Sequence, residues 1–125
     1  MPPPHFFSPF HAMSAPRLQA LHDAGQSLWL DYIDRPMLHN GELARRIRDD
    51  VLTGMTSNPA IFEKALASGT AYDAQVAGLD GDHTAWQLFE QLAADDVRTA
   101  CDLFRGVYDR TRGVDGYVSL EVSPN

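Results

Sequence analysis

The sequence predicts an α/β protein built on parallel strands, and two observations lead to this prediction. Residues 26–33, 51–57 and 117–122 have the apolar pattern of short strands, and helical patterns fill the intervals between them. The first interval is too long for a tight hairpin and long enough for a helical crossover, so we expect parallel strands with right-handed connections. Each strand has a polar side chain near its carboxyl end, where barrel enzymes hold their substrates.

The first sixteen residues differ in composition from the rest of the chain, because they contain Pro2, Pro3, Pro4, Pro9 and Pro16. Proline lacks a backbone donor and disrupts regular helix. We therefore expect residues 1–16 to be a disordered extension and residues 17–125 to form the folded part. A short helix over residues 17–24, ended by Gly25, leads into the first strand.

The first strand and the helix after it are predicted from two different periods. Alternation along the strand gives one face with Leu28, Leu30 and Tyr32, and another with Trp29, Asp31 and Ile33. Asp31 therefore shares a face with a bulky aromatic residue. The helix over residues 42–50 has Leu43 and Ile47 on its apolar side. Its arginines, Arg45, Arg46 and Arg48, take the opposite side and are interpreted as a solvated face.

Two interpretations of Asn58 follow from its place at the end of the second strand, directly before Pro59. Proline suits the first turn of a helix, and asparagine is a preferred residue for capping its amino end. A polar residue at the carboxyl end of a barrel strand is also a substrate contact. Local statistics favour the cap, and the sequence leaves both roles open.

The segment between Asn58 and Gly116 is predicted to be helical, with elements over residues 60–67, 72–79, 84–93 and 95–111. Asp82 or Thr84 is expected to cap the third of these. The strand that follows puts Val118, Leu120 and Val122 on one face and Tyr117, Ser119 and Glu121 on the other. A polar interior around Glu121 is favoured over an exposed edge strand, because an acid is costly to bury without partners.

Composition excludes several classes of protein. The net charge of −7 and the scattered bases leave no cationic stripe for nucleic acid. Cys101 is the only cysteine, and the histidines are isolated, so neither an internal disulfide nor a metal site is expected. We find no membrane-length apolar run and no signal peptide, and therefore expect a cytoplasmic protein.

A resemblance to a known family rests on the segments SLWLD at residues 27–31, TGMTSNPAIF at residues 53–62 and SLEVSP at residues 119–124. These segments resemble the first three strands of the transaldolases, from about Gly25 to the end of the chain. GQSLWLDYIDR, GELARRIRDD and the long helical insertion before the third strand resemble the longer bacterial members. Some of those are fused to a glucose-6-phosphate isomerase.

The resemblance implies a (βα)8 barrel, of which 125 residues hold only the first three strands, because a complete barrel has about 250 residues. It also implies transfer of a dihydroxyacetone unit from sedoheptulose 7-phosphate to glyceraldehyde 3-phosphate in the pentose phosphate pathway. The chemistry uses a lysine Schiff base and no metal or organic cofactor.

Four residues resemble parts of the family's site. Asp31 is similar to the proton-transfer carboxylate of the first strand, and Glu121 to the third-strand acid that works with a catalytic water. Asn58 resembles the asparagine that binds the dihydroxyacetone moiety, and Thr56 is expected to line the same site. Sugar phosphates and the remaining barrel segment are the partners that the resemblance implies.

The lysine content departs from the family pattern. The only lysine, Lys64, follows Asn58-Pro59 in a helix, whereas the family's Schiff-base lysine lies on the fourth strand. We therefore expect the isolated chain to be an inactive amino-terminal portion of a transferase.

Two alternatives belong to other functional classes. One is a non-enzymatic remnant that binds sugar phosphate or pairs with another subunit. The other is an open doubly wound binding module, which is disfavoured because neither strand-to-helix turn has a G-x-G-x-x-G phosphate cradle.

Overall fold

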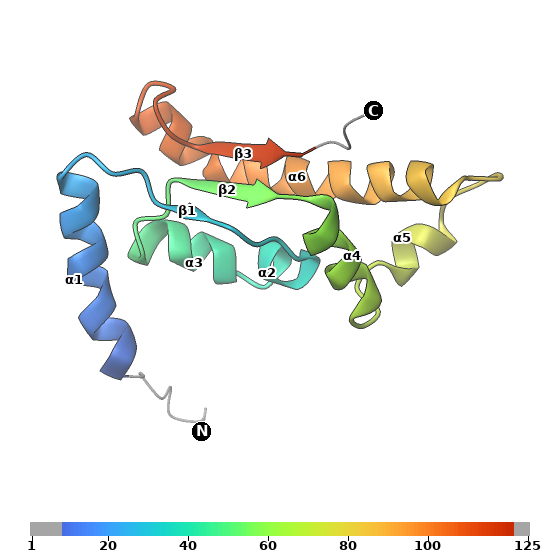
Figure 1. Cartoon of the computed structure of the whole chain (residues 1–125), viewed down its shortest axis with the longest axis horizontal. Coiled ribbons are helices and arrows are strands. Elements are labelled where there is room, and N and C mark those ends of the chain that lie inside the picture. The colour runs from blue at the N-terminus through green and yellow to red at the C-terminus, as the bar shows by residue number, and fades with distance from the viewer. Residues whose placement is uncertain (1–8, 122–125) are drawn as a thin grey trace.

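The computed structural model describes residues 9–121, with side chains from residue 16 onward. Its first helix, α1 (Pro9–Asp23), stands apart from the other elements, beside the amino ends of the strands (Figure 1). The helix begins at Pro9 rather than at the predicted Arg17, so residues 9–16 are helical rather than a loose extension. Pro16 lies inside α1, where it removes a backbone donor without ending the helix. Residues 1–8 of the predicted extension lie outside the described residues.

The sheet confirms the prediction of three parallel strands. They are adjacent in chain order: β1 (Trp29–Leu30), β2 (Gly54–Ser57) and β3 (Tyr117–Leu120). Leu30 pairs with Met55, and Met55 pairs with Val118. Each strand is shorter than its predicted range, and the predicted Val122 lies outside the described residues.

The strand β1 ends at Leu30, so the prediction that Ile33 shares a face with Asp31 is wrong. Ile33 does not share a face with Asp31, because it is fully buried in the core while Asp31 is exposed. The cause is a helix that the sequence pattern did not reveal, α2 (Arg35–His39). Asp34 starts α2 by accepting a hydrogen bond from the Met37 backbone N–H at 2.9 Å.

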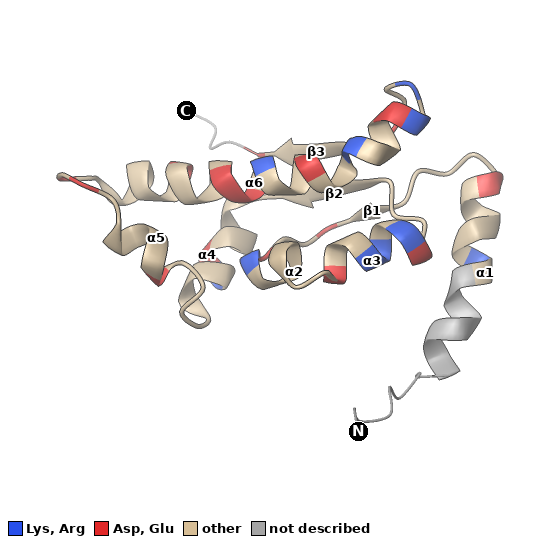
Figure 2. Ribbon diagram, turned by 180° about the vertical axis from the view of Figure 1, so that it is seen from behind, with Lys and Arg blue, Asp and Glu red and all other residues tan. Residues whose placement is uncertain are grey.

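The remaining helices are α3 (Glu42–Asp49), α4 (Pro59–Ala67), α5 (Asp73–Ala77) and α6 (Ala85–Arg110). Helices α2, α3 and α6 cover one face of the sheet, and the described residues place no helix on the opposite face (Figures 1 and 2). This is a partial (βα) barrel, with the helices on the outside of its three strands. We call the face without helices the uncovered face.

Helix α6 replaces the two helices predicted over residues 84–93 and 95–111. The predicted break at Ala94 is wrong, because Asp95 and Asp96 make tertiary contacts instead of ending a helix. Thr84 is the cap of α6, and its hydroxyl and the Gln87 side chain form a reciprocal capping box.

The main core lies between the sheet and the covering helices. Its largest fully buried side chains are those of Phe62, Phe104, Ile33, Leu43 and Met55. Because Met55 of β2 and Val118 of β3 pack into this core, their neighbours along the strands face away from the helices.

The arginines of α3 agree with the predicted solvated face. Arg46 pairs with Glu42 at 2.9 Å and Arg48 with Asp49 at 2.8 Å, all on the same helix (Figure 2). The Arg46–Glu42 pair is partly buried and the Arg48–Asp49 pair is exposed, and both are local to α3. Among the described residues, no helix combines the length and apolar character needed to cross a membrane.

Candidate functional site

The carboxyl ends of β1 and β2 bring two of the predicted site residues together. Asp31 directly follows β1, and the parallel register places it next to Thr56 of β2. The Thr56 hydroxyl donates a hydrogen bond to Asp31 Oδ1. Thr56 adjoins the core residue Met55, so this pair lies on the uncovered face. Within the described residues, the second oxygen of this exposed carboxylate has no hydrogen-bond donor.

A third polar side chain extends this pair onto β3. Ser119 is the register partner of Thr56, and it adjoins the core residue Val118. Ser119 therefore lies on the uncovered face, and Asp31, Thr56 and Ser119 form a polar row across the three strands. The sequence places Ser119 beside Glu121 on one strand, but its alignment with Thr56 depends on register, which the sequence pattern does not give.

Trp29 and Gly54 lie two residues before Asp31 and Thr56 on the same strands. A Cβ atom on Gly54 would come within 2.3 Å of the Trp29 ring. Glycine in β2 therefore leaves room for the indole, which is the kind of close approach that glycine permits inside a strand. The aromatic side chain forms part of the uncovered face on the amino-terminal side of the polar row.

Asn58 caps α4, as one of its two interpretations predicted. Its Oδ1 accepts a hydrogen bond from the Ile61 backbone N–H at 2.9 Å. Within the part of the chain that the structure describes, no further side-chain hydrogen bond involves Asn58. The amide nitrogen is therefore left as a donor beside the carboxyl end of β2.

Glu121 is not joined to the polar row. It directly follows β3, and its backbone N–H donates to the Ser57 carbonyl at 3.2 Å. Between residues 16 and 121, its carboxylate has no hydrogen bond or ion pair, and the residue is exposed. The expectation of a polar interior around Glu121 is therefore wrong for this chain. The outer side of β3 has no neighbouring strand among the described residues, so Glu121 lies at an exposed edge.

Lys64 lies in the last turn of α4, and its side chain is exposed. It lies on the helix that follows β2, whereas the polar row lies across the strands. Its position agrees with the expectation that it is not at a strand end.

The loop after Asp31 is fixed by Asp34. This carboxylate caps α2 through one oxygen and accepts a hydrogen bond from the Tyr32 hydroxyl at 2.6 Å through the other. That hydrogen bond is the main cause that raises the pKa of Tyr32, with desolvation contributing less. The residues directly after Asp31 are thereby tied to the start of α2.

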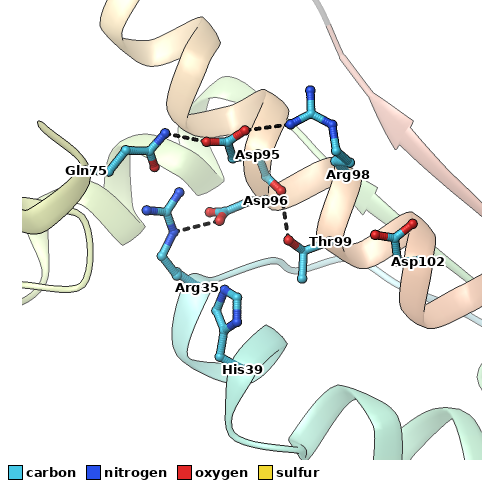
Figure 3. A pocket seen from close by; sticks show the side chains of 8 residues that line it. All are labelled: Arg35, His39, Gln75, Asp95, Asp96, Arg98, Thr99 and Asp102. Carbon is cyan, nitrogen blue, oxygen red and sulfur yellow. Dashed lines mark hydrogen bonds and ion pairs between the residues drawn. The ribbon is translucent and has the colours of Figure 1, made fainter. Parts of the chain in front are cut away.

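A charged cavity lies among the helices, away from the polar row (Figure 3). It has a volume of about 310 Å³ and is lined by Arg35, His39, Gln75, Asp95, Asp96, Arg98, Thr99 and Asp102. Asp95 bridges Gln75 and Arg98 at its rim (Figure 3). Most of these charged side chains pair with one another. The ion pair between Arg35 and Asp96 links α2 to α6.

Two residues that line this cavity, Arg35 and Asp96, form a compact group with Tyr72, which we call the Arg35–Asp96–Tyr72 cluster. Arg35 Nε donates to Asp96 Oδ1 at 2.8 Å, and the Tyr72 hydroxyl donates to Oδ2 at 2.6 Å. The Arg35 guanidinium also lies 4.2 Å from the centre of the Tyr72 ring. Desolvation, followed by the hydrogen bond to Asp96, raises the pKa of Tyr72 well above its usual value.

The described part of the chain contains no group of three His, Cys, Asp or Glu residues placed to hold a metal ion. The polar row and Asn58 supply a carboxylate, two hydroxyl groups and a side-chain amide. These groups can move a proton and bind the hydroxyl groups of a substrate.

Comparisons with known proteins agree with this arrangement. Residues 28–125 match the family described as Transaldolase/Fructose-6-phosphate aldolase. A transaldolase of Thermobifida fusca is 48% identical over 108 residues, which are 86% of this chain and 29% of that protein. A transaldolase of Trichodesmium erythraeum is 44% identical over 108 residues, covering 86% of this chain and 28% of the relative. The chain thus spans less than a third of the length of these curated relatives.

Proposed function

The chain belongs to the transaldolase family, and on that premise we propose that it forms the first three strands of a barrel that transfers a dihydroxyacetone unit. The donor is sedoheptulose 7-phosphate and the acceptor is glyceraldehyde 3-phosphate, in the cytoplasmic pentose phosphate pathway. The observation that supports this most is the Thr56–Asp31 hydrogen bond at the carboxyl ends of adjacent parallel strands. Barrel enzymes hold their substrates at that end of the sheet.

Asp31 is the proton-transfer group in this proposal. Thr56 holds one carboxylate oxygen, and in this proposal the other oxygen exchanges protons with the substrate. Cleavage of the ketose through a Schiff base requires protons to move among water, the carbinolamine and the sugar hydroxyls. A positioned carboxylate supplies this transfer, and the hydroxyl of Thr56 keeps it oriented.

Asn58 serves both as cap and as substrate ligand. The cap uses only Oδ1, which accepts from the Ile61 N–H. The amide nitrogen remains to donate a hydrogen bond to the dihydroxyacetone moiety. Glu121 takes its role with a catalytic water once a neighbouring strand covers the outer edge of β3.

The Schiff-base lysine comes from the barrel segment after the third strand. Lys64 cannot serve, because it is an exposed residue of α4 rather than a strand-end residue facing the polar row. The 125-residue chain alone is therefore inactive, and the remaining barrel segment is its partner in catalysis.

A joined protein tests the proposal. Residues 1–125 are fused to the part of the Thermobifida fusca transaldolase that follows its matched segment, and kcat is measured with both sugar phosphates. We expect transaldolase activity, and a loss of about 10²- to 10⁴-fold in Asp31→Asn, because a positioned proton-transfer group contributes that much. Asp102→Asn is the control, since this exposed acid lies on α6 beside the charged cavity. Unchanged turnover in Asp31→Asn would contradict the assignment.

A further inference from the structure

The indole of Trp29 and the missing side chain of Gly54 fit each other across two strands. The two residues are register partners, and Leu30, the next residue of β1, packs against the core, so Trp29 lies on the uncovered face. A Cβ atom on Gly54 would overlap the indole, and the three atoms nearest to it all belong to that ring. The ring therefore takes the space in which any other residue of β2 would carry its side chain. We call this contact the Trp29–Gly54 pair.

Tyr117, the register partner of Gly54 on its other side, is held by different contacts. Its hydroxyl donates a hydrogen bond to the Gly113 carbonyl, and its ring packs edge-on against Tyr108 with centroids 5.7 Å apart. These contacts tie the Tyr117 side chain to the end of α6 and the loop after it. Trp29 is therefore the aromatic residue that lies nearest to the middle strand at this level of the sheet.

The Trp29–Gly54 pair lies on the amino-terminal side of the hydrogen bond between Thr56 and Asp31. Asp31 is two residues after Trp29, and Thr56 is two residues after Gly54, so the four positions share one face. Successive positions on one face of a strand are about 7 Å apart, a distance that an aromatic side chain spans. The indole lies across both strands and is therefore next to Asp31 and Thr56 alike.

Asp31 has few other contacts that fix its orientation. It follows Leu30, the last residue of β1, so the strand pairing ends just before it. Within the described residues, its only side-chain hydrogen bond comes from Thr56. A carboxylate with a single hydrogen bond can change rotamer unless a neighbour blocks the alternatives. Trp29 supplies such a neighbour, and its large ring has few rotatable bonds to order.

We propose that Trp29 is a positioning residue of the transaldolase site and that Gly54 is the residue that admits it. The indole forms a floor beneath the Thr56–Asp31 hydrogen bond, keeps the carboxylate turned toward the substrate end of the sheet and excludes water from its amino-terminal side. Trp29 itself neither contacts the substrate nor exchanges a proton. The proposal rests on the proposed function, because the orientation of Asp31 matters to the rate only if Asp31 transfers protons.

A cycle of substitutions in the joined protein described above tests the proposal. Trp29→Ala removes the ring, and Gly54→Ala displaces it without removing it. We expect each substitution to lower kcat at least about tenfold, because the proton-transfer group loses its placement. KM should change by less than about threefold, since the groups that bind the ground state are untouched. The double variant should be no worse than the poorer single variant, because both substitutions remove the same contact.

Two further variants separate positioning from packing. Trp29→Phe keeps a ring over Gly54 and should restore kcat to within about threefold of the unsubstituted joined protein. Tyr108→Ala removes an aromatic residue of α6 whose exposure is similar, 39% against 42% for Trp29. It should leave kcat per folded molecule unchanged, with the folded fraction measured by circular dichroism. If Trp29 served only for packing, Trp29→Ala would behave in the same way as Tyr108→Ala.

A measurement on the 125-residue chain tests the contact without any activity. The ring current of an indole displaces the NMR resonances of protons that lie beside it, so the methyl resonance of Thr56 reports on Trp29. We expect Trp29→Leu to shift this resonance several times more than Tyr108→Leu does. An equally small shift in the two variants would overturn the proposal, because the indole would then not lie beside the polar row.

The kinetic outcomes distinguish this proposal from the proposed function. An active joined protein whose kcat per folded molecule is unchanged by Trp29→Ala would overturn the positioning role alone. Additive losses in the double variant would also overturn it, and if Gly54→Ala does not fold, Trp29→Ala and Trp29→Phe decide. A joined protein that folds but has no activity before any substitution would contradict the proposed function, and the positioning role with it.

Discussion

Asp31 and Asp96 are the same residue type in two opposite settings. Asp31 is exposed at the carboxyl end of the sheet and has one hydroxyl donor. Asp96 is only 1% exposed, and both of its oxygens are occupied, by Arg35 and by Tyr72. The buried aspartate can hold α6 against α2 but has no capacity left for a substrate. The exposed one contributes little to packing and keeps an oxygen for chemistry.

This contrast teaches that pairing and burial, rather than residue type, separate a structural acid from a candidate catalytic one. The charged cavity beside Asp96 contains more ionisable groups than the polar row, yet most are committed to each other. The polar row has fewer groups, but they keep unused hydrogen-bond donors and acceptors within the described residues, which a reaction needs.

The largest stability effect is expected for Asp96→Ala. The substitution leaves the guanidinium of Arg35, which is 15% exposed, without its carboxylate. Breaking a buried ion pair from one side costs about 3–5 kcal/mol of unfolding free energy. Urea denaturation measures it. Asp95→Ala is the matched control, because its partner Arg98 is exposed and such pairs contribute about 1 kcal/mol or less. Equal effects of the two substitutions would contradict the structural role of Asp96.

A smaller effect, with a distinctive pH dependence, is expected for Tyr72→Phe. Removing the hydroxyl leaves one Asp96 oxygen without its donor, at a cost of about 1–3 kcal/mol. The folded-state pKa of Tyr72 lies above the unfolded value of about 10. The stability linked to this shift is therefore fully present below pH 10 and is lost as the pH rises further toward the folded-state pKa.

Unfolding free energies measured at several pH values between 9 and 11 test this expectation. Wild-type protein should lose stability above pH 10 more steeply than Tyr72→Phe. Both proteins retain Tyr32, so its raised pKa contributes equally to the two curves. Parallel curves would show that Tyr72 is not held in the buried contact.

The smallest stability effect is expected for Asp31→Asn in the 125-residue chain. The residue is exposed and its partner is a single hydroxyl, so the unfolding free energy should change by no more than about 0.5 kcal/mol. Thermal unfolding followed by circular dichroism provides the measurement. A loss comparable to that of Asp96→Ala would mean that Asp31 supports the fold, and a loss of activity in the joined protein could then not be assigned to chemistry.

The sequence predicted the parts of the fold that depend on local patterns. Three parallel strands, the Asn58 cap and the Thr84 cap follow from apolar periodicity and from capping preferences. The sequence missed the continuity of α6, because aspartates read as breaks when their tertiary partners are unknown. It also missed α2, although an aspartate cap and a proline in the first turn are local signals of a helix start. Asp96 is satisfied by Arg35, 61 positions away, which no local pattern reveals.

The sequence also predicted only part of the candidate site. The sequence and its family resemblance named Asp31 and Thr56, and the structure joins them. The alignment of Ser119 with Thr56 and the reason for Gly54 required strand register and a side-chain contact across strands. Glu121 was expected in a polar interior, but an interior requires strands on both sides of β3, and β2 alone adjoins it in the described residues.

Borohydride trapping with fructose 6-phosphate tests the central claim most directly. Mass spectrometry is performed on the 125-residue chain and on the joined protein after reduction. The account predicts a covalent adduct on the joined protein, at a lysine outside residues 1–125, and none on the chain alone. An adduct on Lys64 of the chain alone would contradict it, as would the absence of any adduct on the folded joined protein.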